Sequence, residues 1–386
     1  MRKRMQVIVS IILCVCLVFL CVAFTGCEEN NTPPSNTGES GRPETPETPE
    51  KPETPETPET PETPETPETP ETPETPETPE KTIVYTNILQ EPSFEKGFGV
   101  KGQKDGFSTV YGYFRPIEGA SGRSAWSVAQ WYSGYFHMQG SQYPAEYNIL
   151  KGEKKVEGSF QSWTDASKTF GFDAEKQEVY LELNASKEYT APRGSEDPWP
   201  HLLVEYTLEQ ANLSSMEELR ISYDYTLHKV ENKMSDSEYD AGKHAAQLVF
   251  YVVVKNTNEA SKDAGKYFWF GIPMYDNRDT ALKDDSWSVD LGSDDKLATN
   301  AFIYQMGSRN YLEELPQVGK TVSVRVEAMD TIKKAFDLAV EYGYLPDSKW
   351  EDMSVTNGNY GFELPGTFDI AATVGQFKVE SGVPES

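Results

Sequence analysis

The 386-residue chain carries 62 acidic and 35 basic residues, which gives a formal net charge of −27. Phosphates and anionic lipid headgroups repel so acidic a chain, so we expect no nucleic-acid partner and no electrostatic attachment to a membrane. All four cysteines lie within the first 27 residues, which excludes a disulfide framework in the rest of the chain.

The first 26 residues have the layout of a secretory signal peptide. Three bases at positions 2–4 precede an almost unbroken apolar run over 7–24, which ends in the small residues Thr25 and Gly26. The sequence Phe24-Thr25-Gly26-Cys27 resembles the bacterial lipobox, although leucine is usual where Phe24 stands. That resemblance implies cleavage before Cys27 and attachment of diacylglycerol and palmitate to this residue. An uncleaved membrane helix, or secretion with cleavage elsewhere, are the alternatives.

A low-complexity segment follows Cys27 and extends to residue 81. Residues 43–80 repeat Pro-Glu-Thr with one lapse at Lys51. Proline at every third position removes amide donors and fixes φ, which excludes helix and sheet and favours polyproline II. At about 3.1 Å per residue the repeat reaches roughly 120 Å. We therefore predict a disordered, extended linker (27–81) that holds a domain away from the membrane, with its threonines open to O-glycosylation.

Residues 82–386 have the strand pattern of one large all-β domain. In 219–228 every odd residue is apolar or aromatic and every even one polar, and Thr321–Glu327 repeats this alternation with three valines on one face. Further strands are predicted at 179–183, 201–206, 247–254, 267–272 and 368–379, with a bulge at Gly375. An antiparallel β-sandwich is the fold that this succession indicates.

One helix is predicted from the apolar spacing of Ile332, Ala335, Phe336 and Ala339. Asp330 is its expected N-cap and Gly343 its expected end. A lone helix on a sandwich is expected to be structural.

Most catalytic chemistries find no support in the sequence. The four histidines share no metal-ligand spacing, and neither a GxSxG nucleophile elbow nor a P-loop is present. Glu205 and Glu209, four apart on a predicted strand, are the nearest approach to the paired carboxylates of a glycoside hydrolase. Arg193, His201 and Tyr206 are the residues from which a polysaccharide lyase site could be assembled.

Glycan binding fits the composition better. Sugar rings stack on aromatic faces while amides, carboxylates and guanidinium groups meet their hydroxyls. Aromatic residues stand among small or polar ones in 126–135, 197–201 and 275–279. The candidate ligand contacts are Trp126, Trp131, Trp199 and Arg278. For each of them a packed core position is the alternative.

Seven aspartates between Asp276 and Asp295 make a structural calcium ion conceivable, although their spacing matches no EF-hand and a solvated acidic loop is the alternative. No other cofactor is expected.

The strand succession, the Trp-rich segments and the late turn Gly361-Phe362-Glu363-Leu364-Pro365-Gly366-Thr367-Phe368-Asp369 resemble the concanavalin-like jelly-roll modules of bacterial surface proteins, many of which bind glycans. The resemblance implies two stacked antiparallel sheets with a polar face. We therefore expect a lipid-anchored, surface-exposed protein outside the cytoplasm whose sandwich binds a polysaccharide without cleaving it. A glycan-degrading enzyme and a structural or protein-binding display module are the two alternatives.

Overall fold

The computed structural model describes residues 82–385, apart from 105–108, 117–118 and 291–298. The signal peptide, Cys27 and the Pro-Glu-Thr linker lie outside the described residues, and the expectations for them stay predictions. In the part of the chain that the structure describes, no helix is long and apolar enough to span a membrane.

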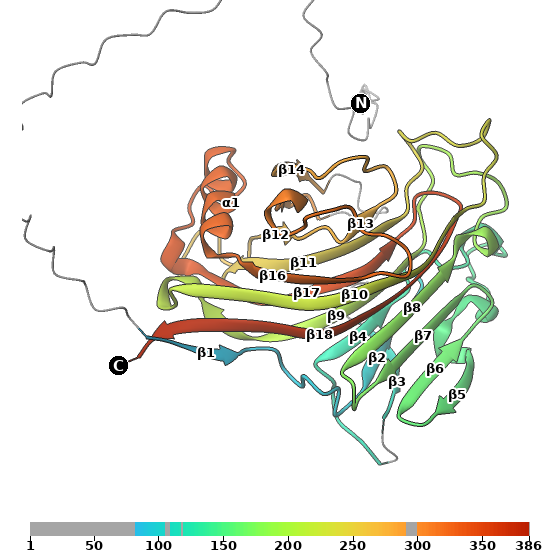
Figure 1. The fold of residues 1–386 in the computed structure, drawn as a ribbon, viewed down its shortest axis with the longest axis horizontal. Coiled ribbons are helices and arrows are strands. Elements are labelled where there is room, and N and C mark those ends of the chain that lie inside the picture. The colour runs from blue at the N-terminus through green and yellow to red at the C-terminus, as the bar shows by residue number, and fades with distance from the viewer. Residues whose placement is uncertain (1–81, 105–108, 117–118, 291–298, 386) are drawn as a thin grey trace, which may run out of the picture. The chain divides into compact units, whose positions relative to one another are not determined.

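The described residues form two β-sheets (Figure 1). The eight-stranded sheet has the order β16 (Thr321–Glu327), β10 (Glu218–Asn232), β18 (Phe368–Pro384), β8 (Glu178–Asn184), β7 (Lys168–Asp173), β6 (Phe160–Thr164) and β5 (Glu153–Glu157), and β1 (Ile83–Asn87) pairs with β18. The ten-stranded sheet has the order β14 (Ser286–Val289), β15 (Phe302–Gln305), β12 (Tyr267–Gly271), β11 (Gln247–Asn256), β17 (Met353–Glu363), β9 (His201–Asn212), β4 (Trp126–Ala129), β2 (Phe98–Lys101) and β3 (Val110–Phe114), and β13 (Tyr275–Asp276) pairs with β11. Short 3-10 helices lie in the connections: η1 (Tyr135–His137), η2 (Ala145–Tyr147), η3 (Ile149–Lys151), η4 (Ala185–Lys187), η5 (Leu213–Ser215), η7 (Ser308–Asn310) and η8 (Trp350–Asp352).

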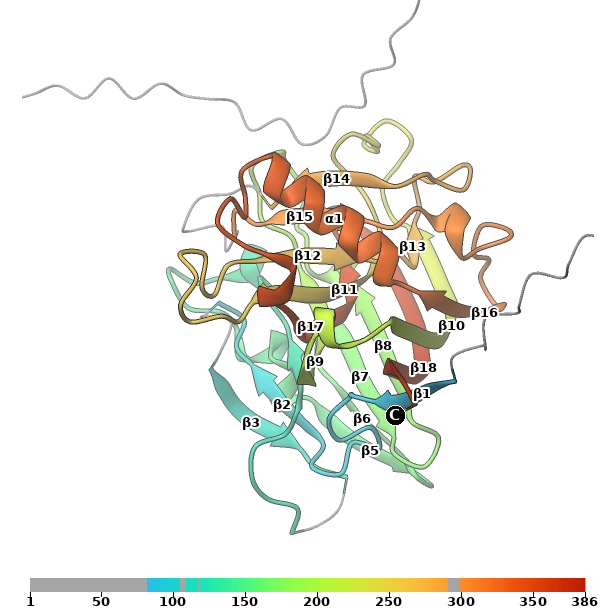
Figure 2. The ribbon, with the colours of Figure 1, turned by 90° about the vertical axis from the view of Figure 1, so that its left-hand side faces the viewer.

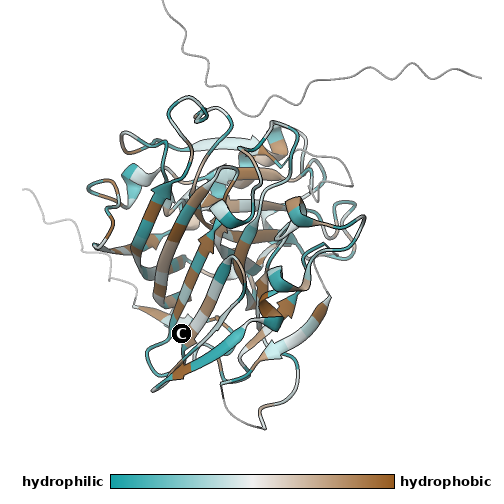
Figure 3. Ribbon diagram, turned by 90° about the vertical axis from the view of Figure 1, so that its right-hand side faces the viewer, coloured by the Kyte–Doolittle hydropathy of each residue, from teal (hydrophilic) through white to brown (hydrophobic). Residues whose placement is uncertain are grey.

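The two sheets pack on each other through aromatic rings. Tyr223 of β10 stacks on Phe250 of β11 with ring centroids 4.8 Å apart, and Phe377 of β18 meets Tyr206 of β9 at the same distance. Strands of both sheets alternate in hydropathy along their length (Figure 3), because successive side chains point to opposite faces. The predicted all-β class, an antiparallel sandwich, is confirmed. Two pairs in the ten-stranded sheet, β2 with β4 and β12 with β15, are parallel.

The strands with the clearest alternation are those predicted. The odd residues of 219–227 in β10 are at most 1% exposed, and β16 buries Val324 and Val326. The bulge predicted at Gly375 is present. Between two successive pairs, Asp224 with Gly375 and Ser222 with Lys378, the chain moves three positions along β18 but only two along β10. Gln376 adopts a positive φ of 53° there.

Helix α1 (Met329–Glu341) buries the predicted face. Ile332, Ala335 and Ala339 are fully buried, and Figure 2 shows the helix passing across β12 and β15. The N-cap prediction was wrong: Ala328 occupies that position and Asp330 lies in the first turn. The carboxylate still benefits from the helix dipole there without capping an amide.

Candidate functional site

The ten-stranded sheet has a second face, opposite the one packed on the main core. Register places one set of residues on it, and we call this set the polar face: Ser127, Ala129, His201, Leu203, Glu205, Gln247, Val249, Tyr251, Val253, Trp269, Ile303, Gln305, Asn357, Asn359, Gly361 and Glu363. Ala129, Leu203 and Val249 form a small apolar cluster at its centre, against which Trp131 and Tyr251 pack. Amides, carboxylates and an imidazole surround that apolar cluster.

Trp126 is not on this face, so its prediction as a ligand contact was wrong. The side chain is 1% exposed and points into the main core, where it meets Phe94 edge-on at 4.9 Å. Its Nε1 donates to the carbonyl oxygens of Gln90 and Glu91. The ring therefore has no surface and no polar atom left for a sugar.

Trp131 lies beside the polar face, in a tight turn of residues 131–134 that we call the aromatic turn. Its carbonyl accepts a hydrogen bond from the amide of His201 at 2.9 Å, which extends the β4–β9 pairing, and its ring stands edge-on to that imidazole with centroids 5.6 Å apart. Tyr132 adopts a left-handed φ of 57°, and Gly134 a φ of 77°. A non-glycine residue in that region costs free energy, so the surrounding structure must hold the turn in place.

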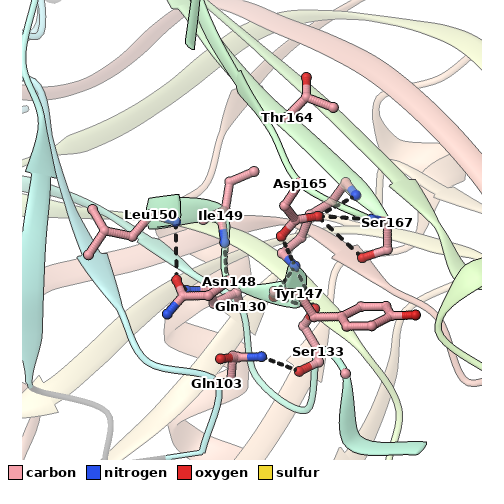
Figure 4. A network of polar contacts seen from close by, with 12 residues as sticks. Gln103, Gln130, Ser133, Tyr147, Asn148, Ile149, Leu150, Thr164, Asp165 and Ser167 are labelled. Carbon is pink, nitrogen blue, oxygen red and sulfur yellow. Dashed lines mark hydrogen bonds and ion pairs between the residues drawn. The ribbon is translucent and has the colours of Figure 1, made fainter. Parts of the chain in front are cut away.

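Buried polar side chains hold the aromatic turn in place through hydrogen bonds (Figure 4). Gln103 donates from Nε2 to the carbonyl of Ser133 at 2.8 Å, while the Gln130 side chain accepts from the amide of Ile149 and donates to the carbonyl of Lys101, both at 2.9 Å. Gln130 itself has no exposed surface. These bonds fix the turn to residues 101–103, which precede it, and to Ile149, which follows it.

A buried ionic cluster completes this support. The Glu188 carboxylate accepts hydrogen bonds from the Ser133 hydroxyl at 2.7 Å, the Gly134 amide at 2.5 Å and the Ser167 hydroxyl. The Lys168 ammonium lies 2.6 Å from Asp165 and 4.0 Å from Glu188. Both Lys168 and Glu188 are 1% exposed, and charges so deeply buried are stable only when paired and hydrogen-bonded.

Trp199 lies on the other side of His201. The two rings stack with centroids 5.8 Å apart, and the guanidinium of Arg193 lies 4.9 Å from the Trp199 ring on which it stacks. His201 Nε2 is 4.0 Å from a carboxylate oxygen of Glu363, its partner on β17. The two tryptophans therefore flank one histidine and one carboxyl group.

Three buried polar atoms here make no direct hydrogen bond among the described residues, although the Trp199 indole lies close enough to Glu363 to moderate the raised pKa of that carboxyl. They are Nε1 of Trp199, Nδ1 of His201 and Oδ1 of Asn359. His201 and Asn359 are each only 8% exposed. Unpaired buried polar atoms are rare in folded proteins, and ordered water or a bound ligand can satisfy them.

The pKa values of Glu363 and His201 are shifted in opposite directions. Burial, and after it the nearby charge of Asp290, raise the pKa of Glu363 to about 7, while the nearby indole N–H of Trp199 acts against both. Burial lowers the pKa of His201 to about 4. At neutral pH the imidazole is therefore uncharged, and the carboxyl is divided between its acid and its anion.

Glu205 lies farther along the polar face and is paired. Its carboxylate accepts from Ser127 at 2.6 Å and forms an ion pair with Lys101. Glu209 is exposed near the end of β9, four residues away, which is about 13 Å along a strand. Glycoside hydrolases need about 5 to 9.5 Å between their two carboxyl groups, so Glu205 and Glu209 do not form such a pair.

Glu205 and Glu363 fail the same criterion. Glu363 pairs with His201, again four residues from Glu205 along β9, so these two carboxyl groups are separated by a similar distance.

The lyase constellation is not assembled either. Tyr206 points into the main core, on the opposite face of β9 from His201, and its hydroxyl donates to the carbonyl of Tyr251. Arg193 donates to the carbonyl oxygens of Ser195, Asp197 and Lys243. Tyr206 therefore does not stand beside that histidine.

Arg278 lies at the β13 end of the polar face. It binds both carboxylate oxygens of Asp276, at 2.8 and 2.6 Å, and Asp276 accepts from Gln247 at 2.9 Å. Because Gln247 is paired with Glu363 across β11 and β17, a continuous row runs from Trp131 through His201, Glu363 and Gln247 to Asp276. Trp131, Trp199 and Arg278 thus gather along one row, although their contact with a ligand stays a prediction.

The described aspartates of 276–290 have protein partners: Arg278 and Gln247 for Asp276, Lys283 for Asp279, Arg309 for Asp284, Lys334 and Tyr304 for Asp285, and Thr299 for Asp290. Among the described residues no group of three histidine, cysteine or acidic side chains could hold a metal. Asp294 and Asp295 lie outside the described residues, and structural calcium stays a prediction.

Sequence reasoning missed the residues at the centre of the site. Glu363 stands in what reads as a turn, and Asn359 in an Asn- and Gly-rich stretch typical of loops; β17 is nevertheless a central strand. Alternation of Tyr360 and Phe362 with Asn359, Gly361 and Glu363 is the signal that could have revealed it.

Comparison with known proteins found no matching family model and no matching curated protein. Solved structures do match. They include a family 12 xyloglucanase from Bacillus licheniformis (12% identity, 59% of this chain and 96% of that chain, TM-score 0.35), the endoglucanase Cel12A from Rhodothermus marinus (11%, 61% and 97%, 0.33) and the family 11 xylanase from Neocallimastix patriciarum (13%, 59% and 94%, 0.33). At these scores the likeness carries no argument about activity.

Proposed function

We propose that the polar face binds a neutral polysaccharide without cleaving it. The observation that supports this most strongly is the grouping of buried polar atoms on Trp199, His201 and Asn359, none of which makes a direct hydrogen bond among the described residues, beside the half-buried ring of Trp131. Each such atom costs about 1–3 kcal/mol if it stays unpaired. Sugar hydroxyls both donate and accept, so they can satisfy an indole N–H, an imidazole nitrogen and an amide oxygen together.

The charges on the polar face favour a neutral polysaccharide over an acidic one. Lys101 and Arg278 on this face are already paired with Glu205 and Asp276, and Arg193, stacked on Trp199, donates to three carbonyl oxygens. Glu363 and nearby Asp290 add negative charge. A polyuronide would meet carboxylates without a free cation among these residues, whereas a neutral sugar carries no charge to be repelled.

Affinity electrophoresis in gels containing neutral or acidic polysaccharides tests the proposal. Retardation by at least one neutral polysaccharide and by none of the polyuronides is the expected result. If no polysaccharide retards the chain while a pull-down yields a specific protein, the face is instead part of a protein-binding display module.

Glycoside hydrolysis is a second candidate, supported by the raised pKa of Glu363. A carboxyl group with a pKa of about 7 suits a general acid, and nearby Asp290 could act as the second carboxylate. Incubation with the same polysaccharides, followed by assay of reducing ends, separates the two functions. A hydrolase releases them and loses this activity in Glu363→Gln, whereas a binding module releases none and the variant still binds.

We further propose that the sandwich is displayed outside the cytoplasm by a lipid on Cys27 and the repeat of residues 43–80. The acidic composition gives the chain no electrostatic route to a membrane surface, so attachment has to come from acyl chains.

A further inference from the structure

A pocket of about 330 Å³ lies where the row of polar-face residues reaches β13. It shares Gln247, Val249, Tyr251 and Gln305 with the polar face, and Ser286 also lines it. Its volume corresponds to about eleven water molecules at roughly 30 Å³ each. A hexose, with about a dozen non-hydrogen atoms, is of that size.

One wall of the pocket is held in place by hydrogen bonds between two segments. Segment 283–286 is pinned to segment 305–310: the Lys283 amide donates to the Ser308 hydroxyl, and the Asp285 carboxylate accepts from the Gly307 amide, both at 2.9 Å. Tyr304 adds a bond from its hydroxyl to Asp285 at 2.7 Å. The row of contacts therefore ends against an ordered wall rather than continuing into solvent.

The lining groups are chemically those of a neutral sugar site. The amide of Gln305 donates to the Tyr251 hydroxyl at 2.8 Å, and Gln247 donates to Asp276; amide side chains carry both donors and an acceptor, which suits the hydroxyls of a sugar. Lys283, the cation in the lining, pairs with Asp279 at 3.4 Å. Val249 supplies an apolar surface for the C–H face of a ring.

We propose that this pocket is a subsite for one neutral sugar unit of the glycan bound along the polar face. The inference rests on the proposed function, because residues shared by the pocket and the polar face would hold neighbouring units of one ligand.

Filling the pocket tests the inference. Ser286→Trp places an indole in the pocket from the edge strand β14, and Ser288→Trp is the matched control, since Ser288 lies on the same strand outside the lining. The probes are cello-, xylo- and manno-oligosaccharides of two to six units, with oligogalacturonides as the acidic comparison, titrated into the whole exported chain by calorimetry. Thermal melts show that each variant is folded.

Ser286→Trp should weaken binding of the neutral oligosaccharide at least tenfold, and Ser288→Trp should change it less than twofold. Lys283→Trp fills the pocket from a second position in segment 283–286 and should repeat the loss. Unchanged affinity in both pocket variants, with loss in Trp131→Ala, would overturn the subsite and leave the proposed function standing. Equal affinity for oligogalacturonides would overturn its neutrality. No binding of any oligosaccharide or polysaccharide by the unsubstituted chain would overturn both proposals.

Discussion

Two tryptophans five residues apart have opposite roles at the residue scale. Trp126 is packed among Phe94, Phe98 and Tyr206, whereas Trp131 is half-buried beside the polar face. Trp126→Ala leaves a large cavity and should lower the free energy of unfolding by about 3–5 kcal/mol. Trp131→Ala should weaken glycan binding at least tenfold, because a stacking face is lost. Denaturant unfolding and calorimetric titration of both variants measure the contrast, and equal effects on stability and binding would contradict it.

Glu363 should make stability depend on pH. Its pKa is raised from 4.5 to about 7 in the folded chain, so between these values the folded state holds a proton that the unfolded state has released. Stability should therefore fall as pH rises from 4.5 to 7, by up to about 3 kcal/mol. The measurement is the free energy of unfolding against pH for the unsubstituted chain and for Glu363→Gln, whose amide cannot titrate.

His201 provides the check on that experiment. Its pKa is lowered to about 4 from 6.5, so its own contribution runs the other way and rises with pH over that range. Because His201 is present in both proteins, its effect cancels in the difference between them, apart from the part that depends on the Glu363 carboxyl 4.0 Å from its Nε2. A difference that stays constant from pH 4.5 to 7 would show that the Glu363 carboxyl is not shifted.

The candidate residues could be predicted only in part. Aromatic composition indicated Trp126 and Trp131 equally as ligand contacts. The sequence alone does not reveal that the even residues of β4, Trp126 among them, point into the core. Glu205 was identified by its parity on β9, but Lys101, its ion-pair partner, comes from β2, about a hundred residues earlier. Contacts between strands distant in sequence decide which groups are free to act.

At the scale of elements, strand prediction succeeded where one face is buried and failed elsewhere. Strand β10 shows strict alternation, and that pattern survives folding because its odd face fills the core. Strand β5, with Lys154 and Lys155 at its centre, is exposed throughout and carries no apolar pattern. Strand β17 contains three glycines or asparagines in succession (357–359), which have low strand propensity. Its strand conformation therefore comes from pairing with its neighbours β9 and β11.

The ionic cluster under the aromatic turn should be essential to it. Glu188→Gln removes the charge that binds Ser133, Gly134 and Ser167 and leaves Lys168 with one carboxylate fewer. Breaking a buried pair from one side costs about 3–5 kcal/mol, so the free energy of unfolding should drop by roughly that amount. Denaturant unfolding measures it. The matched control is Glu157→Gln on exposed β5, for which we expect a change within about 0.5 kcal/mol.

At the scale of the whole molecule, attachment and binding should be separable. The first described residue, Thr82, lies 55 positions after Cys27, and the strands β1 to β18 of the sandwich pair among themselves. A single acyl chain gives only marginal membrane binding, but a diacylglyceryl group with a further palmitate supplies more than one chain and anchors stably.

Cys27→Ser should therefore move the protein from the membrane fraction to the soluble fraction of a bacterial host, and metabolic palmitate labelling should disappear with it. Retardation by the neutral polysaccharide should stay the same, since the polar face is untouched. Labelling that persists in Cys27→Ser would place the lipid elsewhere. Membrane association that persists without any label would mean that the apolar run of 7–24 remains as an uncleaved helix. In either case the lipobox interpretation fails, while the binding proposal depends only on residues of the sandwich.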